Sequence, residues 1–169
     1  MRLWAGVPLL CAIASGFAFS QTAPAWDIHI VSDPQFGSYT ELRLQGAYVK
    51  PPNNVAAQPS LVVRCSDGKV LQNYFSFGAV LSVNVGGLHP VRLETTIDNV
   101  PTVIRVDDLS IDGTAAYFPR RELNRMLYAK QVTVGAVEFA GPPILAKFAM
   151  PDSAPVFAAC GEDRFLKHK

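Results

Sequence analysis

The sequence predicts a mainly β protein, an antiparallel β-sandwich-like single domain with one amphipathic helix and a short C-terminal helix. Three observations support this fold class. Short runs rich in β-branched and aromatic residues recur along the chain. Gly, Pro, Asn and Asp separate these runs at the spacing of turns. Several runs alternate apolar and polar residues, as expected of strands that bury one face against a core.

Residues 1–20 have the composition of a secretory signal peptide. One charge, Arg2, precedes an apolar stretch over residues 3–19, which is short for a membrane span and rich in small residues at its end. Ala18 and Ser20 give the small-x-small pattern that a signal peptidase requires, so we expect cleavage after Ser20. The mature protein is then exported, periplasmic or extracellular, with no stable membrane span.

A lipoprotein is the alternative interpretation of this leader. It would make Cys11 the lipid-modified residue, but Pro8-Leu9-Leu10 in front of it lacks the small residues expected there. The secretory signal is therefore the favoured interpretation.

The chain expected after cleavage has the length of one domain. Removing 20 of the 169 residues leaves 149, enough for one substantial core and too few for two. We assign residues 21–161 to a single β-rich domain and residues 162–169 to a polar C-terminal tail.

The mature chain has no excess of charge. Of the 15 basic and 14 acidic residues, cleavage removes Arg2 and no acid, so 14 of each remain. Nucleic-acid-binding proteins usually carry a basic excess that neutralises phosphates. We therefore expect no nucleic-acid partner.

Two cysteines remain after cleavage, Cys65 and Cys160. Oxidising compartments allow disulfides, and these two residues can form only one intramolecular bridge. We predict that they pair, the alternative being two free buried thiols. Their separation is 160 − 65 = 95 residues, for which chain entropy gives an upper figure of about 4 to 5 kcal/mol of stabilisation.

The β-rich runs predict a meander of antiparallel strands. The expected strands are residues 26–31, 40–49, 61–65, 70–77, 80–85, 91–97, 103–109, 132–139 and 144–150. The segments 66–69, 86–90 and 98–101 contain the Gly, Asn, Asp and Pro residues that tight turns need. Each is expected to close a hairpin.

Residues 40–49 alternate clearly between two faces. Leu42, Leu44 and Tyr48 point to one side, and the other side carries Glu41, Arg43 and Gln45. The pattern predicts that one face of this strand is exposed to solvent.

Two helices are expected. The first begins near Pro119, a favourable first helical residue, and its apolar stripe is Leu123, Met126 and Leu127. Its solvent side is expected to carry Arg120, Arg121, Glu122 and Arg125. The second is a short C-terminal helix with Asp152 or Ser153 as its cap, Pro155 in its first turn and Gly161 as its stop.

The chain contains few signals for metal binding. Residues 108–113 resemble the opening of a calcium loop, but the twelfth position is Pro119, where such loops need a bidentate Glu. A turn between two strands explains the same residues. His29, His89 and His168 form no close ligand pair with each other or with the cysteines. We expect no metal and no cofactor.

Catalytic motifs are also missing. The sequence has no Gly-x-Ser-x-Gly elbow, no His-Glu-x-x-His motif and no phosphate-binding glycine loop. A triad dispersed through the fold leaves no sequence signature, so a secreted hydrolase stays open as the alternative function.

Arg120, Arg121 and Arg125 are the candidate partner-binding residues. Guanidinium groups bind carboxylates bidentately, so this basic helix face could bind an envelope protein or an anionic envelope polymer. A solvated helix face that includes Glu122 is the simpler interpretation.

The order of the elements provides one resemblance to a known family. The shared positions are a Trp in the first strand (Trp26), a Pro-x-Leu-x-x-x-Cys strand (Pro59, Leu61, Cys65), a Val-x-x-x-x-x-Ile-Asp hairpin (Val91, Ile97, Asp98), the strand at 110–118, a helix, a Lys-x-Phe strand (Lys147, Phe148) and a closing Ala-x-Cys-Gly (Ala158, Cys160, Gly161). In these positions, which cover most of residues 21–169, the chain resembles the type VI secretion-associated periplasmic proteins.

The resemblance implies an association with protein secretion and carries over no catalytic residue. Together with the leader, the neutral charge and the missing motifs, it favours an exported, non-catalytic binding or accessory protein of the bacterial cell envelope.

Overall fold

A computed structural model of the chain describes residues 23–35, 37–53, 57–82, 92–137, 139 and 141–161. The predicted signal peptide, the expected turn at 86–90 and the polar tail at 162–169 lie outside the described residues. None of the helices in the described part of the chain has the length and apolarity needed to cross a membrane.

The described residues form strands and two helices. The strands are β1 (Asp27–Asp33), β2 (Gly37–Gln45), β3 (Ala47–Lys50), β4 (Ser60–Ser66), β5 (Lys69–Ser76), β6 (Arg92–Ile97), β7 (Val100–Arg105), β8 (Asp108–Leu109), β9 (Ala115–Tyr117), β10 (Gln131–Val137) and β11 (Pro143–Ala149). The helices are α1 (Arg120–Leu127) and α2 (Ala154–Cys160).

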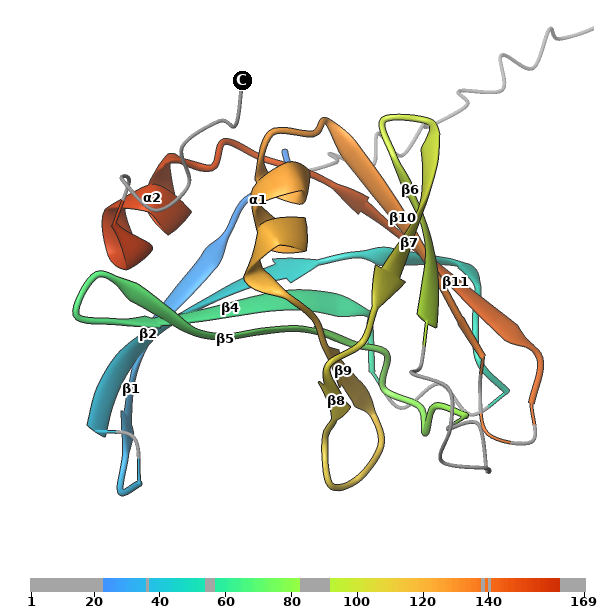
Figure 1. Cartoon of the computed structure of the whole chain (residues 1–169), viewed down its shortest axis with the longest axis horizontal. Coiled ribbons are helices and arrows are strands. Elements are labelled where there is room, and N and C mark those ends of the chain that lie inside the picture. Colours follow the sequence, from blue (N-terminus) through green and yellow to red (C-terminus); the bar gives the residue numbers. More distant parts are fainter. Residues whose placement is uncertain are drawn as a thin grey trace, which may run out of the picture.

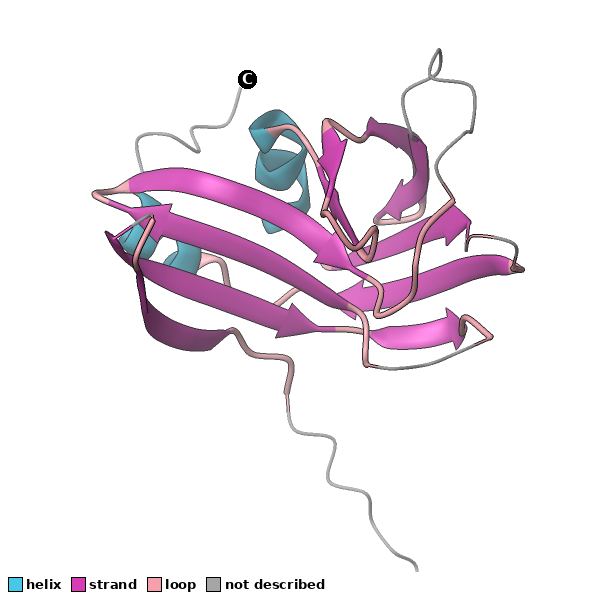
Figure 2. Cartoon of the chain, turned by 90° about the horizontal axis from the view of Figure 1, so that it is seen from below, coloured by secondary structure: helices cyan, strands magenta, loops and turns pink. Residues whose placement is uncertain are grey.

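Two antiparallel sheets pack against each other in a single domain, as the sequence predicts (Figure 1). Sheet A has the strand order β1-β2-β4-β5-β9-β8, and sheet B has the order β3-β11-β10-β6-β7. Both helices lie on the side of sheet A that faces sheet B (Figure 1). Figure 2 looks at the other side of sheet A, with α2 behind its strands. We call this other side the outer face of sheet A.

The core lies between the sheets and is built around Phe75 of β5. Its ring lies 4.9 Å from the ring of Phe118 and 5.4 Å from the ring of Phe148, measured between centroids. Fully buried aliphatic side chains from both sheets complete the core: Leu42, Leu61 and Val63 from sheet A, and Leu93, Val132 and Val134 from sheet B. The apolar residues of the alternating pattern that predicted the strands are therefore the ones that face the core.

The segment expected as one strand at 40–49 is two strands in different sheets. β2 ends at Gln45 in sheet A and β3 begins at Ala47 in sheet B, so the chain changes sheets at Gly46. A Cβ at this glycine would lie 2.6 Å from Phe148 Cε1 and 2.9 Å from the carbonyl oxygen of Lys147. Only a glycine lets the backbone approach β11 this closely.

A second change of sheet divides the strand expected at 103–109. β7 ends in sheet B, and β8 pairs with β9 in sheet A. Between them Val106 is buried and the Asp107 amide donates to the Tyr117 carbonyl, with N and O 2.8 Å apart. The expected strand at 80–85 is also wrong in its described part, because residues 80–82 are a connection with one bridge at Leu81.

Two hairpin turns form where they were predicted. Asp67 and Gly68 link β4 to β5 with φ of 51° and 65°, and Asp98 and Asn99 link β6 to β7 with φ of 48° and 68°. Asp, Asn and Gly tolerate such positive φ values better than other residues do.

Helix α1 begins after Pro119 and buries its predicted stripe of Leu123, Met126 and Leu127. The expectation that Glu122 lies on the solvent side is wrong, because this residue is 7% exposed. Arg121 and Arg125 cover its carboxylate on the surface of the helix.

Helix α2 follows Ser153 and ends at Cys160, and the predicted stop, Gly161, is its C-cap with a φ of 81°. Ser153, one of the two predicted residues, is the N-cap and makes no side-chain cap hydrogen bond. The Ala154 amide donates to Asp152 Oδ1 over 3.0 Å. A disulfide joins Cys160 to Cys65 of β4, with Cα atoms 5.1 Å apart. The predicted bridge thus holds α2 against β4 and β5 on the inner side of sheet A.

Candidate functional site

A row of polar side chains crosses the outer face of sheet A. Glu41 of β2, Arg64 of β4 and Gln72 of β5 are cross-strand partners. Arg64 Nε donates to Glu41 Oε2 over 2.9 Å, and Arg64 Nη1 donates to Gln72 Oε1 over 3.0 Å. Arg43 Nη2 donates to the other oxygen of Glu41 over 2.8 Å. Both carboxylate oxygens of Glu41 therefore have charged donors.

Glu41 is buried, although the sequence predicted an exposed face at this position. Glu41 is only 7% exposed, because the side chains of Arg43 and Arg64 lie against it. Burial by itself raises the pKa of the Glu41 carboxyl, but the hydrogen bonds and charges of Arg43 and Arg64 outweigh it, so the pKa lies below its ordinary value. The carboxylate is held ionised.

Arg64 also contacts two tyrosine rings. Its Cζ lies 5.2 Å from the centroid of Tyr39 and 5.3 Å from that of Tyr74, within the range of cation–π attraction. The ring of Tyr117 follows, 5.0 Å from Tyr74. Burial raises the pKa of Tyr74 and keeps its phenol protonated. These contacts fix Arg64 and make it a rigid part of the surface.

A register shift places Leu71 beside this group. Arg64 pairs with Gln72 and Cys65 pairs with Val70, so Leu71 has no partner in β4. Such irregularities bend a strand and redirect its side chains. Leu71 is 44% exposed and lines a small pocket of about 120 Å³ with Tyr39, Arg64 and Gln72.

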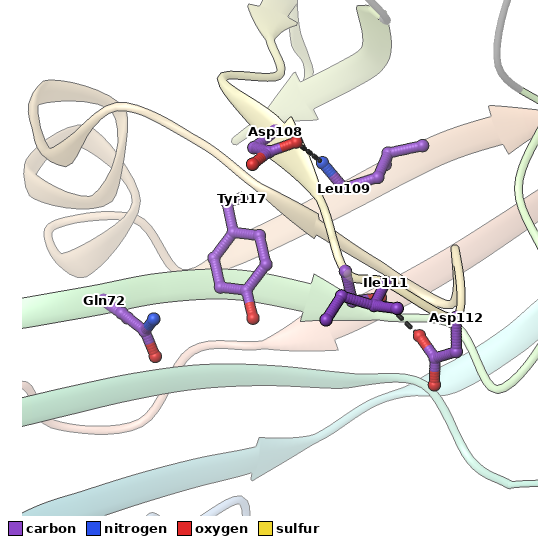
Figure 3. Close-up of a pocket in the computed structure, with 7 residues that line it drawn as sticks. Gln72, Asp108, Leu109, Ile111, Asp112 and Tyr117 are labelled. Carbon is purple, nitrogen blue, oxygen red and sulfur yellow. Dashed lines mark hydrogen bonds between the residues drawn. The ribbon is translucent and has the colours of Figure 1, made fainter. Parts of the chain in front are cut away.

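A larger pocket of about 680 Å³ adjoins it at Gln72. Its floor is formed by Gln72 of β5 and Tyr117 of β9, and the hairpin between β8 and β9 forms its wall (Figure 3). The wall residues are Asp108, Leu109, Ser110, Ile111 and Asp112. Because Gln72 Oε1 accepts from Arg64, its amide nitrogen is the group left to donate to a ligand.

The wall hairpin is stabilised by Asp112. Its Oδ1 accepts hydrogen bonds from the Ser110 hydroxyl at 2.5 Å, the Thr114 amide at 3.1 Å and the Thr114 hydroxyl at 3.0 Å. These hydrogen bonds, that from Ser110 foremost, hold the pKa of the Asp112 carboxyl below its usual range. The segment that resembled a calcium loop is therefore a strand-connecting hairpin, as the simpler interpretation expected.

The charge of the larger pocket is negative. Asp108 and Asp112 line it, and none of its lining residues is Lys or Arg. Ile111 at the hairpin tip is fully exposed and adds an apolar contact next to the two carboxylates. This combination suits a ligand that carries positive charge on an apolar stem.

The predicted arginines lie elsewhere. Arg121 Nε is 3.2 Å from Glu122 Oε1, and Arg125 Nη1 is 2.9 Å from Glu122 Oε2. Arg125 also donates to Thr102 Oγ1 over 3.4 Å. These residues and Arg120 are on α1, on the inner side of sheet A, so the structure does not bring them to the pocket. Their role as partner-binding residues stays a prediction.

The histidines and cysteines do not form a metal centre in the described residues. His29 Nε2 is 2.9 Å from Asp27 Oδ2 on β1, Cys65 and Cys160 form the disulfide, and His89 and His168 lie outside the described residues. In the same part of the chain no group of three or more His, Cys, Asp or Glu residues could hold a metal ion.

Sequence reasoning missed Gln72 and Tyr117. Their strands were predicted, and the alternation of Gln72 and Tyr74 along β5 could have placed both on one face. The missing information was the pairing of β9 with β5, a contact between distant segments.

Comparisons with protein-family models, with curated proteins and with solved structures find no match for this chain.

Proposed function

We propose that the protein is an exported, non-catalytic binding or accessory protein of the bacterial cell envelope, and that the larger pocket on sheet A binds a basic segment of another envelope protein. Its place in the envelope rests on the predicted signal peptide at residues 1–20, and its association with protein secretion rests on the family resemblance. The disulfide is compatible with an oxidising compartment.

One observation carries the choice of ligand: the pocket of about 680 Å³ is lined by two carboxylates and no basic residue. The nearby guanidinium of Arg64 does not neutralise them, because it is bound to Glu41 and Gln72. A Lys or Arg side chain could reach Asp108 or Asp112 while its methylene groups cover Ile111 or the Tyr117 ring.

The rigidity of the surface supports the same function. Gln72 and Tyr117 belong to paired strands, and Gln72 is hydrogen-bonded to Arg64. A site on paired strands loses little conformational entropy when it binds a ligand.

Fluorescence anisotropy with labelled peptides tests the proposal. A Lys- and Arg-containing peptide is expected to bind the processed protein, with an affinity that falls as salt rises, and a Glu- and Asp-containing peptide of equal length is not. The double variant Asp108→Asn, Asp112→Asn keeps the side-chain oxygens that accept the hairpin hydrogen bonds. It is expected to bind the basic peptide about tenfold more weakly, a loss of about 1.4 kcal/mol.

Glu94→Gln is the matched control, because it removes an exposed carboxylate from β6 in the other sheet. It should bind like the unchanged protein. Equal weakening in the control, or no binding of the basic peptide by the unchanged protein, would contradict the proposal.

A further inference from the structure

The two sheets have four edge strands in the described part of the chain. They are β1 and β8 in sheet A, and β3 and β7 in sheet B. An edge strand exposes unpaired backbone N–H and C=O groups, which can pair with a strand of another chain. Natural proteins block this pairing with short strands, prolines, lysines or bulges.

Three of the four edges carry such protection. β8 is two residues long. β3 is four residues long, ends at Lys50, shifts register against β11 and is followed by Pro51. β7 contains Pro101, which has no amide hydrogen to donate.

β1 is less protected, because its only such feature is a proline directly after its end, Pro34. It is seven residues long, pairs with β2 in unbroken register over its whole length and contains neither Pro nor Lys. Ile28 and Ile30 are 50% and 84% exposed. Both lie on the inner face of sheet A, the face that Leu42 shares. Helix α2 packs on that face against β4 and β5, and the two isoleucines of β1 stay exposed. β1 is thus a long edge strand of sheet A (Figure 1) with two exposed β-branched side chains.

We propose that β1 pairs antiparallel with β1 of a second copy of this chain, about a two-fold axis that passes beside His29. The two sheets A then form one continuous sheet across the dimer. In this register Ile28 of each copy lies opposite Ile30 of the other. The two-fold symmetry gives two such pairs, so all four exposed isoleucines are partly covered in the dimer.

Charge disfavours one of the two neighbouring registers, and the other, with the axis on Ile28, would place Ile30 opposite Trp26, which is already buried. Centring the axis on Ile30 would place Asp27 opposite Asp33 in both halves of the ladder, and like charges directly opposite each other are destabilising. With the axis at His29, Asp27 lies opposite Val31 instead. The strand is therefore complementary to itself in this arrangement.

The proposed contact is small. One strand from each copy buries less than the roughly 1,200 Å² of a standard stable interface, so the dimer is reversible and depends on concentration. The pocket lies at the β8 edge, across sheet A from β1, so the dimer presents both pockets at the far ends of the joined sheet. The inference does not depend on what the pocket binds.

Sedimentation equilibrium of the processed protein tests the association. The unchanged protein is expected to shift from monomer to dimer as its concentration rises, and Ile30→Lys is expected to stay monomeric. Because Ile30 is 84% exposed, its replacement should leave the thermal midpoint of the monomer unchanged. Val100→Lys is the matched control: it changes an exposed β-branched residue on the β7 edge and should dimerise normally.

Cysteine cross-linking tests the register. His29→Cys places two thiols opposite each other across the axis, so mild oxidation should produce a covalent dimer. Ser32→Cys, three residues along the same strand, places its two thiols roughly 20 Å apart at about 3.3 Å per residue and should stay monomeric. A monomer at every concentration, equal loss of dimer in Val100→Lys, or equal cross-linking of both cysteine variants would overturn the proposal.

Discussion

Glu41 and Arg64 face each other across β2 and β4 on the outer face of sheet A, with Arg64 Nε 2.9 Å from Glu41 Oε2. The pair lies away from the main core, yet Glu41 is 7% exposed. Because Arg64 also binds Gln72, the pair links β2 to the floor of the larger pocket. The charges of this face thus have a structural role beside the binding role that we propose for the pocket.

Glu41→Gln is expected to lower the free energy of unfolding at pH 7 by about 2 kcal/mol, the scale of hydrogen bonds to a charged group. The pKa of Glu41 in the folded protein is below its ordinary value of 4.5. The stabilisation that the ionised Glu41 carboxylate provides is therefore complete above pH 4.5, and it is lost as the pH falls through the lower pKa of the folded protein.

Thermal unfolding from pH 7 to pH 3 provides the check. The stability gap between the unchanged protein and Glu41→Gln should narrow below about pH 4.5, whereas Glu94→Gln should show no comparable gap at pH 7. A gap that stays constant over the whole range would show that the ion pairs of Glu41 do not stabilise the fold.

Removing the disulfide is expected to cost about 2 to 5 kcal/mol of stability, the usual range for a small secreted domain. The variant is Cys65→Ala, Cys160→Ala, because alanine adds no polar group where both cysteines are buried. Circular dichroism should show the same strand content and a lower midpoint. Two free thiols in the denatured, unreduced, processed protein would contradict the bridge.

Gly46→Ala is expected to destabilise the domain by about 1 to 3 kcal/mol, the usual cost of overpacking. Its Cβ would contact the ring of Phe148 and the backbone oxygen of Lys147, which cannot rotate away. Denaturant unfolding measures the change. An unchanged midpoint would show that the crossing from β2 to β3 does not need close approach to β11.

Much of the fold could be predicted from the sequence, because its signals are local. Alternation along the chain identified most strands, and Asp67-Gly68 and Asp98-Asn99 marked two hairpins. The cysteine pair followed from there being two such residues after the predicted signal. The strand and turn patterns each span only a few neighbouring residues, and the cysteine pairing has a single intramolecular solution.

The changes of sheet and the pocket could not be predicted in this way. Gly46 sits within an apparently continuous strand pattern, and its role depends on Phe148, about a hundred residues away in sequence. The burial of Glu41 depends on Arg64 of β4, the strand that pairs with β2 in sheet A. The pocket depends on the pairing of β9 with β5. Each requires the positions of segments that are distant in the sequence.

The most direct test of the proposed function is a ¹⁵N NMR titration of the processed protein with a Lys- and Arg-containing peptide. We expect the shifted signals to be those of the Gln72 side-chain amide and of the backbone at residues 108–112 and 117, which surround the larger pocket. Shifts confined to α1, around Arg121 and Arg125, or to the outer face of sheet B would contradict the assignment of the binding site to this pocket.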